Sequence, residues 1–212
     1  MTKKKLLSVL AALAAGVSAM AQSIPAPTTS SSTGLLGQRY VDASFSAQDA
    51  HSFSDHAYGL GVAVNLPFNE SLDFGLGYDY GWLNSSVDTR SHTLSASATT
   101  YTTYNGMKPF FGAALGYGWT RAEVGSFSHK DNNGIWGLGA GVEIPVKAVT
   151  LTPSLSYADS FKGGSTGVYA AGLEANHWFT KAVAGFADVS FSDARGHGGE
   201  AWNYGVGVRV KF

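Results

Sequence analysis

The sequence contains no cysteine among its 212 residues, which excludes disulfides, a thiol nucleophile and a thiolate metal site. Charge is also scarce: Asp, Glu, Lys and Arg make up 14% of the chain, whereas an average soluble domain has about 25%. The formal net charge of −1 gives no reason to expect a nucleic-acid partner. The fold must therefore be held by backbone pairing and by burial of apolar side chains.

The sequence also lacks, after its first residues, any apolar run approaching the 18 residues of a transmembrane helix. The apolar stretch Leu6 to Val17 is about a dozen residues long; it follows the basic residues Lys3 to Lys5 and precedes Ala19-Met20-Ala21, a small-x-small cleavage pattern. This order of basic, apolar and small residues is typical of a secretory leader. We therefore predict a cleaved signal peptide at residues 1–21.

The next stretch, residues 22–36, is short of the side chains that build a core. It carries Pro25, Pro27 and a Ser/Thr run at 28–33, and this composition predicts a flexible periplasmic linker. We expect the remaining residues, 37–212, to form one folded domain.

Alternation of apolar with small or polar residues runs through that domain. In the closing stretch, Trp202, Tyr204, Val206, Val208, Val210 and Phe212 share one face, and Asn203, Gly205, Gly207, Arg209 and Lys211 share the other. A period of two is the period of a β-strand. Similar stretches recur along the chain and predict about ten strands, near 39–45, 58–66, 72–82, 91–104, 111–119, 136–144, 149–157, 169–176, 186–191 and 202–212.

The connections between these stretches are of two kinds. Short turns are predicted near 67–69, 105–106, 145–147 and 179–181, and longer polar loops near 47–57, 84–92, 121–134, 159–167 and 192–200. Short turns at one end and long loops at the other are typical of a transmembrane barrel. We predict an all-β fold, an antiparallel up-and-down transmembrane β-barrel of about ten strands. Loss of the weakest stretch, 91–104, with a neighbour would leave the alternative of eight.

The aromatic residues indicate which face meets lipid. Trp82, Trp119, Trp136 and Trp202 fall at the strand ends next to long loops, and Trp178 falls at an opposite end. Two such belts are typical of the interfacial girdles of a membrane protein. A soluble barrel would instead present its Gly- and Ser-rich face to water, which is a poor surface because it has few charges. We therefore expect the apolar face to be outside.

The inner face then carries most of the charges of the strands. We expect a lumen charge network made of Asp42, Asp73, Asp79, Glu143, Glu174, Asp188, Arg209 and Lys211. These groups either form a structural hydrogen-bonded network or line a polar pore.

No recognisable chemistry stands out among the histidines. His51, His56, His92, His129 and His197 fall in predicted long loops without metal-ligand spacing, and no Ser–His motif is present. We therefore predict no catalytic residue, no metal and no cofactor.

Several stretches resemble small bacterial outer-membrane β-barrel proteins of the OmpA/OmpX type. They are Val41–Phe45, Gly59–Pro67, Pro109–Gly112, Gly116–Trp119 and, above all, the closing Tyr204–Phe212. The resemblance covers about 37–212 and implies an outer-membrane location in a Gram-negative envelope. It also implies an assembly signal, read by the barrel-assembly machinery, in Tyr204, Val206, Val208, Val210 and Phe212.

Three functions follow from these predictions. The first is a structural or surface-interaction role through the extracellular loops, with the lipid bilayer and lipopolysaccharide as partners. The second is a narrow, cation-preferring passive pore. The third is an outer-membrane enzyme acting on lipid or peptide, which we favour least because no nucleophile motif supports it.

Overall fold

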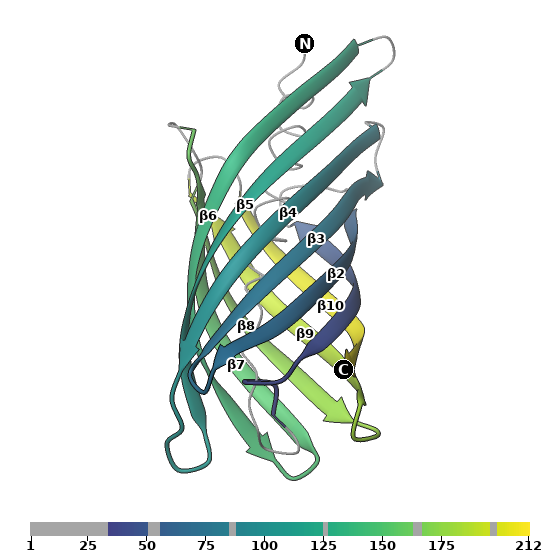
Figure 1. The fold of residues 1–212 in the computed structure, drawn as a ribbon. Coiled ribbons are helices and arrows are strands. Elements are labelled where there is room, and N and C mark those ends of the chain that lie inside the picture. The colour runs from purple at the N-terminus through teal and green to yellow at the C-terminus, as the bar shows by residue number, and fades with distance from the viewer. Residues whose placement is uncertain (1–33, 51–55, 85–87, 125–126, 163–166, 196–198) are drawn as a thin grey trace.

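The computed structural model describes residues 34–50, 56–84, 88–124, 127–162, 167–195 and 199–212. The predicted signal peptide and most of the predicted linker, 22–36, lie outside these residues. Ten antiparallel strands form a closed barrel (Figure 1). They are β1 (Tyr40–Ala50), β2 (His56–Asn69), β3 (Leu72–Asn84), β4 (Asp88–Tyr101), β5 (Lys108–Val124), β6 (Phe127–Val146), β7 (Val149–Ser160), β8 (Val168–Trp178), β9 (Val183–Ala194) and β10 (Gly199–Lys211).

Each strand pairs with the next one in the chain, and β1 closes the barrel against β10, with Asp42 directly opposite Arg209. The predicted up-and-down barrel of ten strands is therefore confirmed. The eight-strand alternative is wrong, because β4, which has the weakest alternation, pairs along its length with both β3 and β5. In the described part of the chain, no helix is long and apolar enough to cross a membrane.

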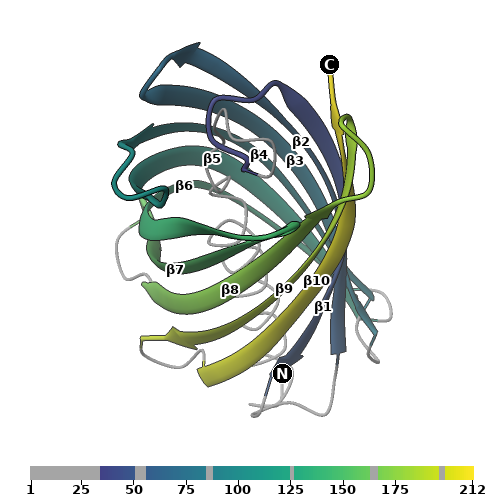
Figure 2. The same ribbon diagram turned by 90° about the horizontal axis from the view of Figure 1, so that it is seen from below.

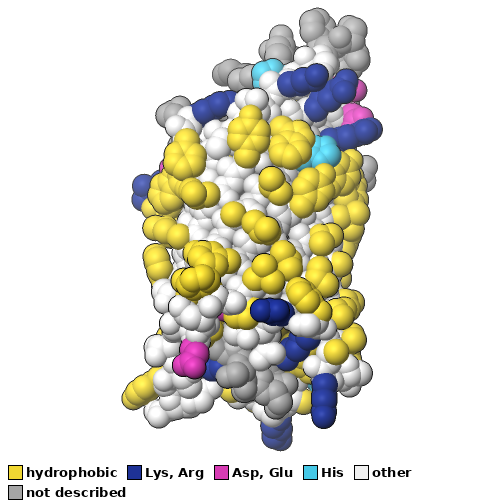
Figure 3. Space-filling model, viewed as in Figure 1, with side chains coloured by type: hydrophobic (Ala, Val, Ile, Leu, Met, Phe, Trp, Pro, Cys, Tyr) yellow, Lys and Arg dark blue, Asp and Glu magenta, His cyan; other side chains and the backbone are white. Residues whose placement is uncertain are grey.

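The two faces of the strands differ as the alternation predicts. Along β10, Trp202, Tyr204 and Val206 are exposed, while Asn203 and Gly205 are buried. The other strands repeat this arrangement, so large apolar side chains cover the outside of the barrel (Figure 3). Exposed apolar surface of this extent is unfavourable in water and is matched by the hydrocarbon of a bilayer.

The two ends of the barrel are unlike each other. Short turns join β2 to β3, β4 to β5, β6 to β7 and β8 to β9 at what we call the turn end; the opposite end is the loop end. Asn105 and Gly106 have φ angles of 50° and 78°, the left-handed conformation that Asn-Gly favours in a tight turn. Lys147, in the β6–β7 turn, also has a positive φ of 57°.

The predicted long loop at 121–134 is wrong. Most of it belongs to β5, which continues to Val124, and to β6, which begins at Phe127. The predicted loop at 84–92 is likewise shortened, because β4 begins at Asp88. Strands can extend beyond the bilayer without apolar alternation because their backbone ladders satisfy one another. The alternation therefore marks where strands lie in lipid rather than where they end.

Candidate functional site

The turn end of the lumen is filled by the chain itself. Residues 34–37, which we call the plug segment, precede β1 and curve into the barrel (Figure 2). Leu35 and Leu36 are fully buried, and Leu36 belongs to an apolar cluster with Tyr101 and Phe110. The predicted linker thus ends inside the barrel, which its Pro- and Thr-rich composition did not indicate.

Two carboxylates of the barrel wall hold the backbone of the plug segment. The amides of Leu35 and Leu36 donate to Oε2 of Glu143, at 3.0 and 3.2 Å. The amide of Gly37 donates to Oδ2 of Asp73 at 3.1 Å. Carboxylates that accept backbone N–H groups make stronger hydrogen bonds than neutral acceptors do. The plug segment is therefore anchored by β3 and β6 as well as by apolar burial.

Asp73 also joins the plug segment to its surroundings. Its Oδ2 accepts a hydrogen bond of 3.0 Å from Nδ2 of Asn65, and its Oδ1 accepts one of 3.4 Å from the Tyr101 hydroxyl. Asn65 donates in addition to the carbonyl oxygen of Gln38, just after the plug segment, at 3.0 Å. These bonds satisfy polar groups that are shielded from water, so the turn end of the lumen is a packed, hydrogen-bonded region.

An arginine occupies the lumen next to this region. Arg209 is 4% exposed, and its guanidinium donates to both carboxylate oxygens of Glu174, at 2.6 and 2.9 Å. Its Nε donates to Oδ2 of Asp42 at 3.3 Å. The guanidinium carbon lies 4.1 Å from the centroid of the Phe186 ring, which adds a cation–π contact. The Tyr40 ring lies 5.5 Å from the same carbon, so two acids and two aromatic rings surround one cation.

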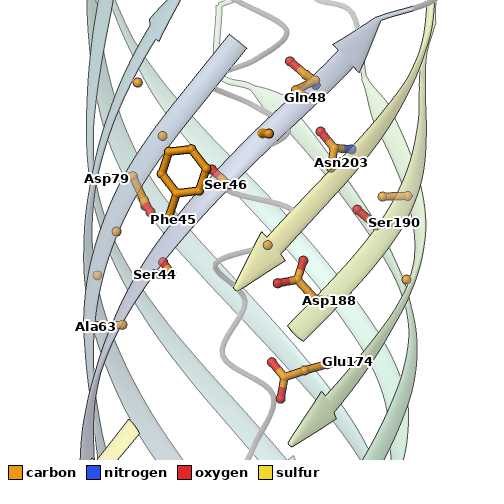
Figure 4. Close-up of a pocket in the computed structure, with 18 of the residues that line it drawn as sticks. Ser44, Phe45, Ser46, Gln48, Ala63, Asp79, Glu174, Asp188, Ser190 and Asn203 are labelled. Atoms are coloured by element: carbon orange, nitrogen blue, oxygen red, sulfur yellow. The ribbon is translucent and has the colours of Figure 1, made fainter. Parts of the chain in front are cut away.

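Towards the loop end the lumen widens into a cavity of about 210 Å³. Asp79, Glu174 and Asp188 point into it from β3, β8 and β9 (Figure 4). Serines of several strands complete the wall, and none of the histidines in the described ranges lines the cavity. One oxygen of Asp79 is buried without a hydrogen-bond partner among the described residues. The cavity wall combines apolar with polar side chains, and its charged groups are more negative than positive.

The lumen charges predicted from sequence therefore fall into three groups. Asp73 and Glu143 hold the plug segment, Asp42 and Glu174 pair with Arg209, and Asp79 and Asp188 line the cavity. Lys211 contacts an aromatic ring instead: its Nζ is 3.7 Å from the centroid of the Trp178 ring, at the turn end.

Trp178 corrects the predicted aromatic girdle. It lies on the lumen side of β8, the same face as Glu174 and the buried Asn176, rather than on the lipid side. It falls there because strand parity, not aromatic character, decides which side a residue takes. At the loop end, Trp82, Trp119, Trp136 and Trp202 do lie on the outer face.

A histidine belongs to the girdle at the loop end. His92 lies in β4, not in a loop, and its ring stacks on Trp119 with centroids 5.4 Å apart. Its Nδ1 is 2.7 Å from the Tyr78 hydroxyl. His56 and His129 also lie in strands, whereas His51 and His197 are outside the described residues. Within the described ranges, no three residues of metal-binding type cluster.

The residues of the predicted assembly signal lie on β10 and directly after it. Tyr204, Val206, Val208 and Val210 form an exposed apolar stripe on the outside of β10. Phe212 follows the strand and is exposed, and its amide donates to the carbonyl oxygen of Arg39 at 3.2 Å. The C-terminus therefore sits at the turn end, beside the start of β1.

Comparisons with known proteins find this architecture among solved structures only. No protein-family model matches the sequence, and no curated protein matches it. Solved structures do match, among them the translocator domain of the autotransporter NalP from Neisseria meningitidis, at 13% identity and a TM-score of 0.52, covering 97% of each chain. The β-domain of the Bordetella autotransporter BrkA matches at 10% identity and a TM-score of 0.52, covering 82% of this chain and 99% of that one.

Neisserial surface protein A matches at 17% identity with a TM-score of 0.46, covering 82% of this chain and 96% of that one. At these identities, the matches to the NalP and BrkA domains show a shared fold alone, that of a closed β-barrel.

Proposed function

We propose that the protein is an integral outer-membrane barrel, exported through a cleaved signal peptide, that serves as a closed scaffold and presents its loop end to the cell exterior. The likeness in fold and the apolar outer face support the location. Barrels of this kind have their short turns in the periplasm, which places the plug segment on the periplasmic side. The role then belongs to the loop end, as a structural or surface-interaction surface.

The observation that carries this proposal is the plug segment. Ten strands give a narrow lumen, close to the size that side chains alone can fill. Leu35 and Leu36 occupy its turn end; Glu143 accepts hydrogen bonds from their two backbone amides, and Asp73 accepts one from the amide of Gly37. A solute passing through would have to displace apolar packing and three hydrogen bonds. The closed lumen therefore favours a scaffold over a channel.

Planar-bilayer recording of the purified full-length protein tests this proposal. The wild-type protein is expected to be silent. A variant with Leu35→Asn and Leu36→Asn is expected to show small openings, because position 36 would lose its apolar contacts with Tyr101 and Phe110 and both positions would bury a polar amide. Arg39→Asn, at an exposed position just beyond the plug segment, serves as the control. A steady, porin-sized conductance in the wild type would contradict the scaffold.

A second candidate, a narrow cation-preferring pore, is favoured by the charge of the cavity. Asp42, Asp79, Glu174 and Asp188 line it together with a single arginine, Arg209. A low-dielectric wall focuses such a field and attracts cations. If the variant with Leu35→Asn and Leu36→Asn shows openings, its reversal potential in a salt gradient should indicate that cations pass more readily than anions. A reversal potential that indicates anion preference would contradict this charge assignment.

We propose no enzymatic activity for the cavity: among the residues that the structure describes, no histidine that could activate a nucleophile lines it. We propose that the barrel-assembly machinery recognises the exposed stripe of β10 and Phe212 during insertion.

A further inference from the structure

Three cations form a row across the outside of the barrel near the loop end. Arg90 of β4 is directly opposite Arg121 of β5, and Arg121 is directly opposite Lys130 of β6. All three are exposed, and each lies on the outer face of its strand. We call these residues the cation row. In Figure 3, Lys and Arg side chains gather in this upper part of the molecule, above aromatic and other apolar side chains.

The cation row lies just beyond the aromatic girdle. His92 and Trp119 are directly opposite each other, two residues nearer the middle of the barrel on β4 and β5. Two residues of strand correspond to about 7 Å. Leu94 and Tyr117 follow on the same face and are exposed, as the hydrocarbon-facing residues are. Because aromatic girdles mark the membrane–water interface, the cation row stands at the depth of lipid headgroups.

Like charges directly opposite one another on a sheet are destabilising, and the protein neutralises this row only in part. Arg90 pairs with Asp88 at 3.0 Å, and Arg121 pairs with Glu123. Both acids lie two residues farther from the bilayer than the arginines do. Among the described residues, Lys130 takes part in no ion pair. The side of the row that faces the bilayer is thus a line of positive charge without a matching anion.

We propose that the cation row binds the phosphate of a phosphorylated glycolipid in the outer leaflet. This inference rests on the outer-membrane location proposed above. Arg90 and Arg121 present guanidinium groups, which bind phosphate oxygens in pairs, and Lys130 adds a third charge. The girdle below offers flat rings, and the apolar face beneath it continues as a surface for acyl chains. A free anion would use only the three cations, whereas a lipid would also contact the aromatic rings and the apolar face. The location of the cation row next to these surfaces therefore favours a lipid.

The test measures binding of a fluorescent diphosphorylated lipid A to the purified full-length protein in detergent micelles. The variant replaces Arg90, Arg121 and Lys130 with Gln. A matched control replaces Arg39, Lys147 and Lys181, three exposed cations towards the turn end, with Gln, and so removes the same charge. We expect the cation-row variant to lose roughly 10-fold or more in affinity and the control to match the wild type.

Two further arms separate the possible sources of the anion. Dephosphorylated lipid A should bind the wild type as weakly as the phosphorylated lipid binds the cation-row variant. Millimolar inorganic phosphate should leave most of the lipid bound; full displacement would mean a site for free phosphate and would overturn the lipid assignment. Equal affinity of variant and wild type, or equal loss in the matched control, would overturn the proposal.

Folding and location are checked independently of binding. The shift in gel mobility between boiled and unboiled samples reports whether each variant is folded. Should the triple variant fail to fold, Arg121→Lys keeps the charge but loses the paired donors, and should still weaken binding; unchanged affinity would count against the proposal. Fractionation of cells that make the wild type tests the outer-membrane location. A protein found outside the outer membrane would contradict the location, whereas unchanged lipid binding by the variant would contradict the binding site.

Discussion

Arg209 of β10 and Glu174 of β8 are joined by two parallel hydrogen bonds, 2.6 and 2.9 Å long, although β9 lies between their strands. The same guanidinium reaches Asp42 on β1, so three strands meet at one side chain. These groups are almost completely removed from water, where an unpaired charge is costly. The pair therefore ties the barrel wall together at a point where loss of one partner harms the other.

Replacement of Arg209 with Met should destabilise the barrel strongly. Asp42 and Glu174 would be left buried side by side without a cation, and breaking a buried pair in this way costs about 3–5 kcal/mol. Urea unfolding in lipid vesicles, followed by tryptophan fluorescence, measures the change. Arg39→Met, at an exposed position, is the control and should shift the midpoint little. A similar small shift for Arg209→Met would show that the network is not structural.

Two glycines of β10, Gly205 and Gly207, should respond differently to replacement by alanine. A Cβ at Gly207 would overlap the Phe186 ring and lie 2.5 Å from the carbonyl oxygen of Ala43, which belongs to the backbone. The atoms nearest to a Cβ at Gly205 would all belong to the side chain of Asp188, which can turn into the cavity. Gly207→Ala should therefore lower the yield of folded barrel much more than Gly205→Ala. Gel mobility of unboiled membranes gives the folded fraction, and equal yields would contradict the reasoning.

The alternation of residues was sufficient to predict about ten strands, though not where they end towards the loops, because every strand has one lipid face and one lumen face. It could not predict which lumen groups meet. Glu174 and Arg209 are 35 positions apart, and their contact depends on the register of two successive pairings. Leu35 and Leu36 were missed for a related reason: two leucines at the end of a Ser/Thr/Pro stretch have no period, although such an isolated apolar pair is the signal that could have been read.

Deletion of Phe212 should sharply reduce the amount of assembled protein. The residue is exposed at the end of the stripe on β10, and its backbone amide donates one hydrogen bond to the carbonyl oxygen of Arg39, which immediately precedes β1. Loss of stability alone should then be small, about 1 kcal/mol, whereas loss of recognition should leave aggregated or degraded chains. Pulse-chase analysis of outer-membrane fractions checks this. Refolding of the deleted chain in detergent, expected to succeed, separates recognition from stability; wild-type levels in cells would refute the signal.

Insertion of a charge on the outer face tests its contact with lipid. Leu115, in the middle of β5, is 60% exposed. Leu115→Arg should cost about 2–4 kcal/mol in a bilayer, as arginine does near the midplane of membrane barrels. Leu115→Met is the conservative control. Unfolding free energies in vesicles provide the measurement, and a cost below 0.5 kcal/mol, roughly that of an ordinary surface change in water, would be incompatible with a lipid-facing position.

Every neighbouring pair of strands in this barrel is joined by a connecting segment except one, β1 and β10. Connections limit how far two strands can slide, so the seam between the chain's first and last strands is the pairing with the least covalent guidance. Because side chains alternate with a period of two, a slip of two residues there would leave each side chain of β1 and β10 on the face that it now occupies. It would, however, move Arg209 from Asp42 to Tyr40 or Ser44. The ion pair at Asp42 thus distinguishes the correct closure from slipped ones that hydrophobicity alone would accept.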